Sequence, residues 1–316
     1  MRYYNESPAE QVFRQFGPFV HLYTKPLEHN VYFHDKQDRT VAINFLSIAV
    51  SQSGCRLLAF AFMSNHFHFI LRGTPREIDI FREEFSRRFM QYVHRRGILQ
   101  DEMTATVNPI NDVRQLRTEI AYVLRNPFVV RSDIHVFANP WTSGHLYFNP
   151  LLPHEGTPVS QLKGRASRNF FRSHQPAEIN SGIMVKDGEA QLWSFVDYQL
   201  VESLFDNARQ FIYSVLKNVE SLARIAEKLG EKASFSDEEL LPQTLKLCRE
   251  KFHAENIQAL SATDKIQLAQ CLKFEYSASN KQIARLLKSP IDEVDALFPL
   301  SSCERQTDQC PTFPEQ

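Results

Sequence analysis

The sequence predicts an α+β domain, in which helices pack on an antiparallel sheet, followed by an all-α C-terminal domain. Two observations support the first part: strand-like and helix-like segments are interleaved over residues 1–150, and two of the strands are separated by only three residues. The second part rests on residues 194–300, where apolar side chains recur at helical spacing. A chain of 316 residues, 43% of them hydrophobic, is long enough to bury two cores.

The first elements are predicted in the order strand, helix, strand, strand. Residues 18–26 are β-branched and aromatic, which favours a strand. Residues 38–54 space their apolar side chains as a helix does and end at a glycine. Residues 55–62 and 66–72 are two further apolar strands, and the three-residue break between them predicts an antiparallel hairpin.

Two helices complete the predicted domain. From residue 75 to residue 96, aromatic side chains recur at helical spacing, and the remaining positions are rich in arginine. A second helix is predicted over residues 112–125 from the spacing of its apolar side chains. Because Pro127 disfavours helical backbone at the residue before it, we expect this helix to end at Asn126.

Composition suggests how the chain is divided. Proline, glycine and serine punctuate residues 151–193, which also carry a basic patch, and this is typical of a linker. We therefore expect a first domain over residues 1–150, a linker over 151–193, a helical domain over 194–300 and a flexible tail over 301–316.

Charge and cysteine content limit the class of protein. Residues 1–172 hold 21 Lys or Arg and 15 Asp or Glu, whereas residues 173–316 hold 15 and 22, so only the first part suits a polyanionic partner. The five cysteines are scattered without a CxxC pair, which indicates reduced thiols. Because we find neither a secretion signal nor an apolar run of membrane-spanning length, we expect a cytoplasmic protein with no membrane partner.

Two histidines, His66 and His68, lie one residue apart in a predicted strand. Side chains alternate between the faces of a strand, so both histidines share one face, about 6.6 Å apart. Two neutral imidazoles at that spacing can hold one metal ion. The same pattern is also typical of two half-buried histidines that are hydrogen-bonded within the fold.

Tyr122 and Asn126 are four residues apart in a predicted helix and therefore lie on one helical face. The apolar stripe of Leu116, Ile120 and Leu124 occupies the opposite face. A phenol beside an amide would place a nucleophile and a metal ligand one helical turn apart. A surface tyrosine that packs against a neighbour is the other interpretation of this pattern.

Three segments together resemble a known family. FMSNHFHFIL contains a histidine–hydrophobe–histidine motif, AYVLRNP a tyrosine on a helix, and NPWTSGHLYF a downstream Trp-Ser…Tyr element. Their order and spacing over residues 15–150, about half of the chain, are similar to those of the single-tyrosine HUH transposases, and most of all to the REP-associated tyrosine transposases. The segment between the histidine strand and the tyrosine helix departs from the family pattern.

The resemblance implies a fold, a reaction and residue roles. The implied fold is ferredoxin-like, with His66 and His68 as metal ligands on a central strand, Asn126 as the third ligand and Tyr122 as the nucleophile. The implied reaction is cleavage of single-stranded or hairpin DNA through a 5′-phosphotyrosine intermediate. Imidazole and oxygen ligands suit Mg²⁺ or Mn²⁺, and Mn²⁺ better. The resemblance is compatible with a monomer and with a homodimer.

Two groups of residues are expected to contact DNA. In the helix over residues 75–96, arginines would neutralise phosphates, although an ordinary solvated helix face has the same composition. Residues 263–298 predict three short helices that resemble a helix-turn-helix, although a small bundle for protein contact is the other interpretation. The expected DNA contacts are Arg82, Arg87, Arg88, Arg95 and Arg96 in the first group, and Lys281, Gln282 and Arg285 in the second.

These observations predict a transposase, that is, a metal-dependent single-strand DNA endonuclease and strand transferase. Two hypotheses compete with it. The first is a catalytically inactive, domesticated DNA-binding protein that recognises hairpin repeats. The second is a hydrolytic metal nuclease that forms no covalent intermediate. A covalent protein–DNA adduct would distinguish the transposase from both.

Overall fold

The computed structural model describes residues 6–27, 31–98, 103–130, 136–173, 179–217 and 237–299, with single residues between 222 and 235. The chain forms two compact units, residues 1–231 and residues 232–316. The boundary therefore lies after residue 231, whereas we predicted it near residue 193. The expected tail over residues 301–316 lies outside the described residues.

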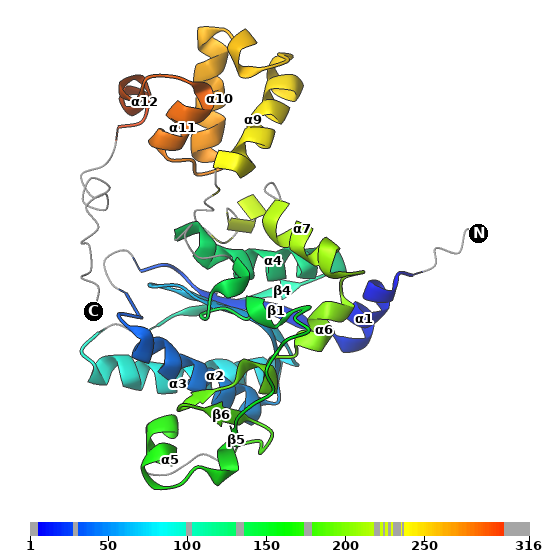
Figure 1. Ribbon diagram of the computed structural model, residues 1–316, viewed down its shortest axis with the longest axis vertical. Helices are drawn as coiled ribbons and strands as arrows, with labels where there is room; N and C mark the ends of the chain where they lie inside the picture. Colours follow the sequence, from blue (N-terminus) through cyan, green and yellow to red (C-terminus); the bar gives the residue numbers. More distant parts are fainter. Residues whose placement is uncertain are drawn as a thin grey trace. The chain divides into compact units, whose positions relative to one another are not determined.

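The first unit is built on a four-stranded antiparallel sheet (Figure 1). The strands lie in the order β2-β3-β1-β4. They are β1 (Phe19–Thr24), β2 (Arg56–Phe62), β3 (Phe67–Arg72) and β4 (Ala105–Ile110). One helix connects β1 to β2 and another connects β3 to β4, so the connectivity is βαββαβ. The predicted α+β fold with a ferredoxin-like sheet is confirmed.

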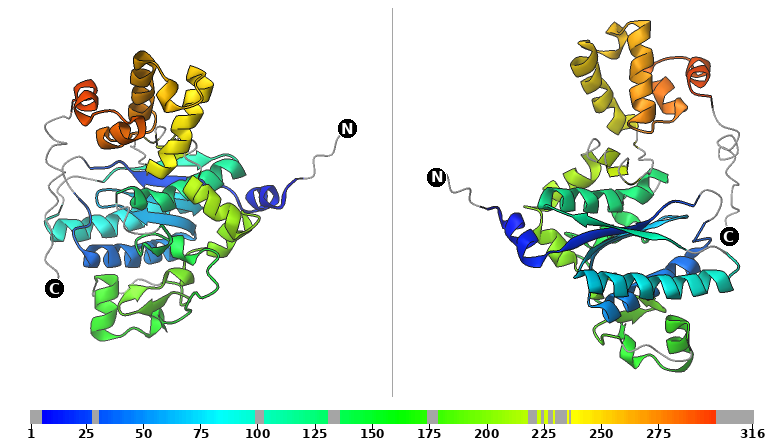
Figure 2. Two further views of the ribbon diagram at one scale, coloured as in Figure 1. Left: turned by 45° about the horizontal axis from the view of Figure 1, so that its top comes forward. Right: turned by 180° about the vertical axis from the view of Figure 1, so that it is seen from behind.

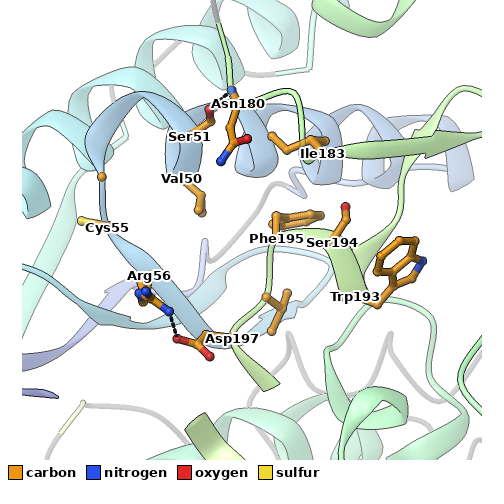
Figure 3. A pocket seen from close by; sticks show the side chains of 12 residues that line it. Val50, Ser51, Cys55, Arg56, Asn180, Ile183, Trp193, Ser194, Phe195 and Asp197 are labelled. Carbon is orange, nitrogen blue, oxygen red and sulfur yellow. Dashed lines mark hydrogen bonds and ion pairs between the residues drawn. The ribbon is translucent and has the colours of Figure 1, made fainter. Parts of the chain in front are cut away.

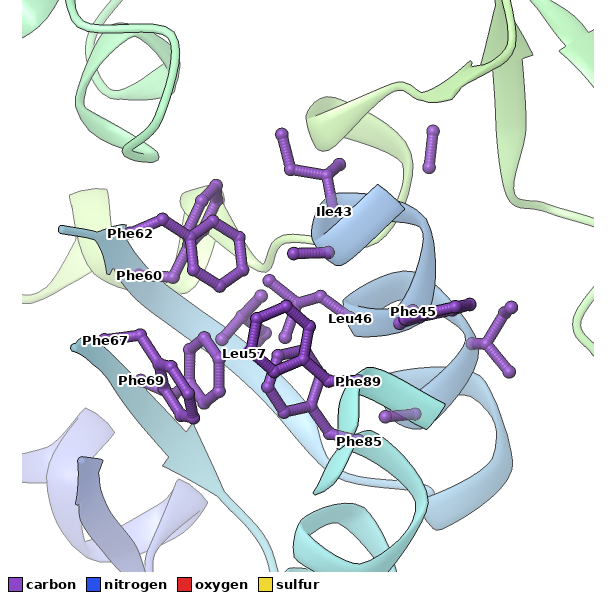
Figure 4. Packing of buried hydrophobic residues seen from close by; sticks show 14 of the residues in the cluster. Ile43, Phe45, Leu46, Leu57, Phe60, Phe62, Phe67, Phe69, Phe85 and Phe89 are labelled. Atoms are coloured by element: carbon purple, nitrogen blue, oxygen red, sulfur yellow. The ribbon is translucent and has the colours of Figure 1, made fainter. Parts of the chain in front are cut away.

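One face of the sheet is covered by the two connecting helices, α2 (Lys36–Ser53) and α3 (Pro75–Arg95). Asp35 and Thr74 start these helices with capping boxes, and Gly54 ends α2 in the left-handed conformation, with φ of 80°. Between these helices and the sheet lies a core of phenylalanines, including Phe67 and Phe69 of β3 (Figure 4). Each buried ring contributes roughly 1.5–3 kcal/mol.

The other face of the sheet is covered by α4 (Val113–Val130), which contacts β2 and β3 (Figure 2). The expectation that this helix ends at Asn126 is wrong, because the helix continues through Pro127 to Val130. A proline inside a helix removes one backbone hydrogen bond. The stripe of Leu116, Ile120 and Leu124 is fully buried, and this packing offsets the local penalty.

One strand and one helix within residues 1–150 were not predicted. The strand β4 lies at the edge of the sheet, and Pro109 lies within it, which is where a strand tolerates proline. The helix α1 (Pro8–Phe16) begins at Ser7, whose side chain forms a capping box with Glu10.

The residues expected to form a linker are folded onto α2. They contain the helix α5 (Gly164–Phe171) and a small sheet of β5 (Thr157–Pro158), β6 (Met184–Lys186) and β7 (Glu189–Ala190). The amide of Asn44 on α2 donates to the carbonyl of Gly188 and accepts from the backbone of Ala190, both at 2.8 Å. The linker prediction therefore does not describe this segment, because its polar turns are anchored by buried side chains of α2.

The end of this segment runs along the outer edge of the sheet. A cavity of about 390 Å³ lies between the end of α2, the start of β2 and residues 193–197 (Figure 3). Arg56 and Asp197 form an ion pair at 2.9 Å beside it. The helices α6 (Tyr198–Ser203) and α7 (Ala208–Lys217) follow and contact β2 and α4, respectively. These contacts explain why the unit extends past residue 194.

The segment NPWTSGHLYF protects the edge of β2. The backbone N–H of Phe62 donates to the carbonyl of Trp141, and Ser143 exchanges hydrogen bonds with Phe60. The hydroxyl of Tyr147 donates to the carbonyl of Leu58. An exposed edge strand invites pairing with other chains, and this segment covers it.

The second unit is helical, as predicted. It contains α9 (Asp237–Phe252), α10 (Ala262–Phe274), α11 (Asn280–Leu287) and α12 (Ile291–Leu297). Among the residues that the structure describes in both units, short 3-10 turns lie at Val136–Ala138, Gly144–Leu146, Val159–Gln161, Leu192–Ser194 and Ile257–Ala259. Within the described part of the chain, we find no helix with the length and hydrophobicity needed to cross a membrane.

Candidate functional site

The two histidines singled out in the sequence lie on the face of the sheet that α4 covers. His68 is in β3 and 0% exposed, and His66 directly precedes β3 and is 7% exposed. Their ring centroids are 5.1 Å apart. His66 Nδ1 lies 2.8 Å from Oδ1 of Asn65, so its Nε2 is the nitrogen left for a ligand.

The helix α4 brings the other two predicted residues to the same place. The ring of Tyr122 meets the ring of His68 edge-on, with centroids 5.7 Å apart. One turn later, Asn126 Nδ2 lies 3.0 Å from His68 Nε2. The structure therefore gathers all four residues predicted for the reaction around His68.

Sequence reasoning missed a buried pair behind His68. Glu119 on α4 accepts a hydrogen bond from His21 Nδ1 on β1 at 2.8 Å, and His21 Nε2 lies 3.0 Å from His68 Nδ1. His21 is 0% exposed and Glu119 is 2% exposed. Gln115 donates to the other carboxylate oxygen of Glu119 at 2.7 Å. These contacts form a continuous chain from Gln115 to Asn126.

This chain of hydrogen bonds fixes which nitrogen of His68 carries the proton. A neutral imidazole donates from one ring nitrogen and accepts at the other. The carboxylate of Glu119 accepts from His21 Nδ1, and in a neutral His21 this leaves Nε2 as an acceptor. His68 must then donate from Nδ1, so the lone pair of His68 lies on Nε2, the nitrogen that faces Asn126.

Both histidines are held in their neutral form. Burial lowers the pKa of His66 to about 4. The pKa of His68 lies well below its usual value, first because of burial and then because of the neighbouring His66 and His21. Both imidazoles are therefore unprotonated at pH 7, as metal ligation requires.

A metal ion here would have two imidazoles and one amide as ligands. Among the described residues, no group of three or more His, Cys, Asp or Glu side chains is placed to hold a metal ion. The donor set would instead be His66, His68 and the side-chain oxygen of Asn126, whose amide nitrogen is the atom that faces His68 here. Two neutral nitrogen donors and one oxygen donor fit Mn²⁺, and Mg²⁺ less well.

The nucleophile candidate is enclosed. Tyr122 is 4% exposed, and Asn126 is 9% exposed. A second tyrosine, Tyr23, stacks on His68 with centroids 6.0 Å apart and is 5% exposed. Tyr23 faces the same histidine from β1, and sequence reasoning did not identify it. The sequence contained a signal for Tyr23, because Tyr23 and His21 are two residues apart in the same strand and therefore lie on the same face.

Two other tyrosines of this unit have structural roles. The hydroxyl of Tyr92 donates to Asp38 at 2.7 Å on the opposite side of the sheet. The hydroxyl of Tyr147 contacts Ser143 at 2.7 Å, and burial raises the pKa of Tyr147. Among the described residues, Tyr122 and Tyr23 are the tyrosines whose rings contact His68.

The predicted DNA-binding arginines lie on α3, on the opposite face of the sheet from the histidines. Several of them form ion pairs there: Arg82 with Asp79, Arg87 and Arg88 with Glu84, and Arg96 with Asp35 and Asp38. Arg95 is exposed. The structure therefore does not bring these arginines together with Tyr122.

The predicted DNA contacts of the second unit lie at the start and middle of α11. The side chain of Gln282 completes the capping box of Ser279 and donates to the carbonyl of Phe235 at 2.6 Å. Arg285 forms a two-pronged ion pair with Asp237, at 2.6 and 3.1 Å. Lys281 is exposed. Gln282 and Arg285 therefore both make contacts within the unit.

Comparison with known proteins gives one distant likeness. No protein-family model matches the chain, and no curated protein matches it. The chain is similar to a solved structure of a REP-associated tyrosine transposase bound to a REP hairpin, with 14% sequence identity and a TM-score of 0.33. The similarity covers 44% of this chain and 83% of that chain. The role of the site therefore rests on its own geometry.

Proposed function

We propose that the first unit is a metal-dependent single-strand DNA endonuclease and strand transferase, a transposase with Tyr122 as its nucleophile. One observation supports this above all others: residues from separate elements, His66 and His68 of the β3 region and Tyr122 and Asn126 of α4, converge on His68. A tyrosine nucleophile needs activation, and the two neutral imidazoles and the amide beside Tyr122 would hold a metal ion that supplies it.

His66, His68 and Asn126 would hold the divalent ion, Mn²⁺ or Mg²⁺. The ion, when bound, would polarise the scissile phosphate and offset its developing charge. His68 already has its lone pair on the correct nitrogen, because His21 and Glu119 fix its tautomer. Asn126 would present its oxygen in place of the amide nitrogen that now faces His68.

Tyr122 would perform the covalent step. Its oxygen forms a bond to phosphorus while the bond from phosphorus to the 3′ oxygen breaks, and the phenol loses the proton that the leaving 3′ oxygen gains. The products are a 5′-phosphotyrosine and a free 3′-OH. Because the bond energy is retained in the link, another 3′-OH can reverse the step and join strands. Since Tyr122 is 4% exposed, DNA binding must widen the space between α4 and the sheet.

A second candidate function is supported by how closed the site is. Both ring nitrogens of His68 are engaged, by His21 and by Asn126, and Tyr122 is buried. A domesticated, inactive DNA-binding protein would keep such a network for the fold alone. It would bind hairpin DNA without forming an adduct.

An adduct assay on a single-stranded hairpin DNA with Mn²⁺ tests the proposal. We expect the wild-type protein to form a complex that survives denaturation, and Tyr122→Phe to form none while keeping its fold and its hairpin affinity. The matched control is Tyr213→Phe, the same change at a tyrosine of α7 that is 63% exposed. Hairpin binding without an adduct in the wild type would favour the inactive protein, and cleavage without an adduct would favour the hydrolytic nuclease.

A further inference from the structure

A second cleft lies on the side of the first unit where α2 and α3 cover the sheet. A cleft of about 550 Å³ lies between α3 and the residues that end α5. Its volume is within the range of pockets that bind small ligands. The cleft is lined by Phe45, Arg87, Arg88, Gln91, Tyr92, Arg95, Arg96, Phe171, Arg172 and Ser173.

The lining is strongly positive. Five of the ten lining residues are arginines, and none is acidic. Three carboxylates outside the lining pair with part of this charge: Glu84 contacts Arg87 and Arg88, and Asp35 and Asp38 contact Arg96. Among the described residues, no carboxylate forms an ion pair with the remaining two arginines. These are Arg95 and Arg172.

Arg172 is held in an unusual way. It ends α5 in the left-handed conformation, with φ of 50°, and its guanidinium lies 5.8 Å from the centre of the Tyr92 ring. Its Nε is buried and has no hydrogen-bond partner among the described residues. A buried donor without an acceptor costs about 1–3 kcal/mol. A ligand rich in oxygen acceptors would remove that cost.

Three aromatic residues also line the cleft. Phe45, Tyr92 and Phe171 contribute to its walls, so guanidinium groups and aromatic rings lie side by side. This combination suits a nucleotide, whose phosphate pairs with arginine while its base packs against a ring. Arginine is well suited to phosphate because its planar group offers two parallel donors.

We propose that this cleft binds the backbone of single-stranded DNA, with phosphates on Arg95 and Arg172 and a base against the aromatic wall. The site lies on the sheet face away from Tyr122 and goes beyond the proposed cleavage centre. The strand would be held here whether or not it is cleaved. The small sheet and α5 add Arg172 to the cleft and so complete it.

The test measures binding of a fluorescent oligothymidine without a hairpin to the full chain, in EDTA so that no cleavage occurs. Removing one arginine that neutralises a phosphate should reduce the slope of log K against log salt by about 0.7. We expect this reduction and a weaker affinity for Arg95→Gln and for Arg172→Gln, and about twice the reduction for the double variant. Arg95→Lys, which keeps the charge, should retain the wild-type slope. The matched control is Arg76→Gln, the same change at an exposed arginine of α3 outside the cleft.

An unchanged slope and affinity in both Arg95→Gln and Arg172→Gln would overturn the proposal, as would an equal loss in Arg76→Gln. Arg95 is exposed, so its variant reports binding even where Arg172→Gln fails to fold. A competition arm identifies the source of the phosphate. If thymidine monophosphate displaces the oligothymidine at equal nucleotide concentration, the cleft is a nucleotide site and the proposal of a strand-binding cleft is overturned. If thymidine monophosphate does not displace the oligothymidine, the cleft binds a DNA strand. Because no adduct is measured, this result is independent of Tyr122.

Discussion

The two faces of strand β3 are equally buried but differ in chemistry. Phe67 and Phe69 are 0% exposed and pack edge-on against Phe85 of α3. His68 is also 0% exposed, but it lies in a chain of hydrogen bonds with His21 and Asn126. Burying an aromatic ring stabilises a fold directly, whereas burying polar groups costs free energy unless each one is paired. An apolar strand would fold with fewer requirements, and this difference is why we propose a chemical role for the histidine face.

Removing the central histidine should give the largest functional effect. We expect His68→Ala to abolish Mn²⁺-dependent cleavage, because it removes one proposed ligand and the link to His21. The free energy of unfolding should also fall, by about 2–5 kcal/mol, because the change opens a cavity and leaves His21 Nε2 without its donor. Denaturant unfolding and the cleavage assay measure the two effects. His94→Ala, at an exposed histidine of α3, is the control. Unfolding of His68→Ala under native conditions would indicate a purely structural histidine.

The corresponding change on the aromatic face, Phe69→Ala, should lower the stability of the fold but leave cleavage intact. Phe69 contacts Phe62, Phe81 and Phe85 and is fully buried. We expect Phe69→Ala to lower the free energy of unfolding by about 3–5 kcal/mol, through reduced burial and a cavity. Cleavage by the molecules that remain folded should persist at low temperature. If Phe69→Ala abolished cleavage without loss of stability, the two faces would not be separable.

The histidine face should also make stability depend on pH. In the unfolded chain His66 has its ordinary pKa near 6.5, whereas burial lowers the folded value to about 4. Between these values the unfolded chain binds more protons, so the free energy of unfolding falls as the pH falls from 6.5 to 4. The loss reaches about 3 kcal/mol for this one group, and stability is fully present above pH 6.5. Urea unfolding of the metal-free protein over this range measures it. The curve of His66→Gln should be flatter, and identical curves would contradict the assignment.

The smallest effect is expected from the buried carboxylate. Glu119→Gln keeps the shape of the side chain but can present its amide nitrogen to His21, which loosens control of the tautomer. We expect Mn²⁺ affinity to fall about 10–100-fold, as for other residues that orient metal ligands. Electron paramagnetic resonance of free Mn²⁺ measures the affinity, and ¹⁵N shifts of His68 report the tautomer without metal. An unchanged tautomer and affinity would show that Glu119 does not position His68.

The sequence was sufficient to predict the strands and helices whose apolar side chains recur with a clear period. The run His66 to Leu71 sorts histidines and phenylalanines to opposite faces, and the structure has that arrangement. The strand β4 was missed because an edge strand tolerates Pro109 and leaves most of its residues only half-buried. The extension of α4 past Asn126 was missed because the local penalty of proline is visible in sequence and the packing that offsets it is not.

The candidate site was predicted in part for a similar reason. Tyr122 and Asn126 share a helical face, and local spacing shows that. His21 and Glu119 are 98 residues apart in sequence, and only the pairing of β1 with β3 brings His21 beside His68. A lone histidine in an apolar strand was the available signal. Contacts between residues this far apart in sequence produce no periodic pattern, so the sequence alone does not reveal them.

The most direct test of the whole account is to map the DNA adduct to a residue. Tyr122 and Tyr23 both face His68, so peptide mapping by mass spectrometry distinguishes them. We predict that the trapped nucleotide lies on the peptide that contains Tyr122, and that Tyr122→Phe forms no adduct while Tyr23→Phe still does. An adduct on a peptide without Tyr122, or an undiminished adduct in Tyr122→Phe, would contradict the proposal that the histidine face of the sheet is a tyrosine nuclease site.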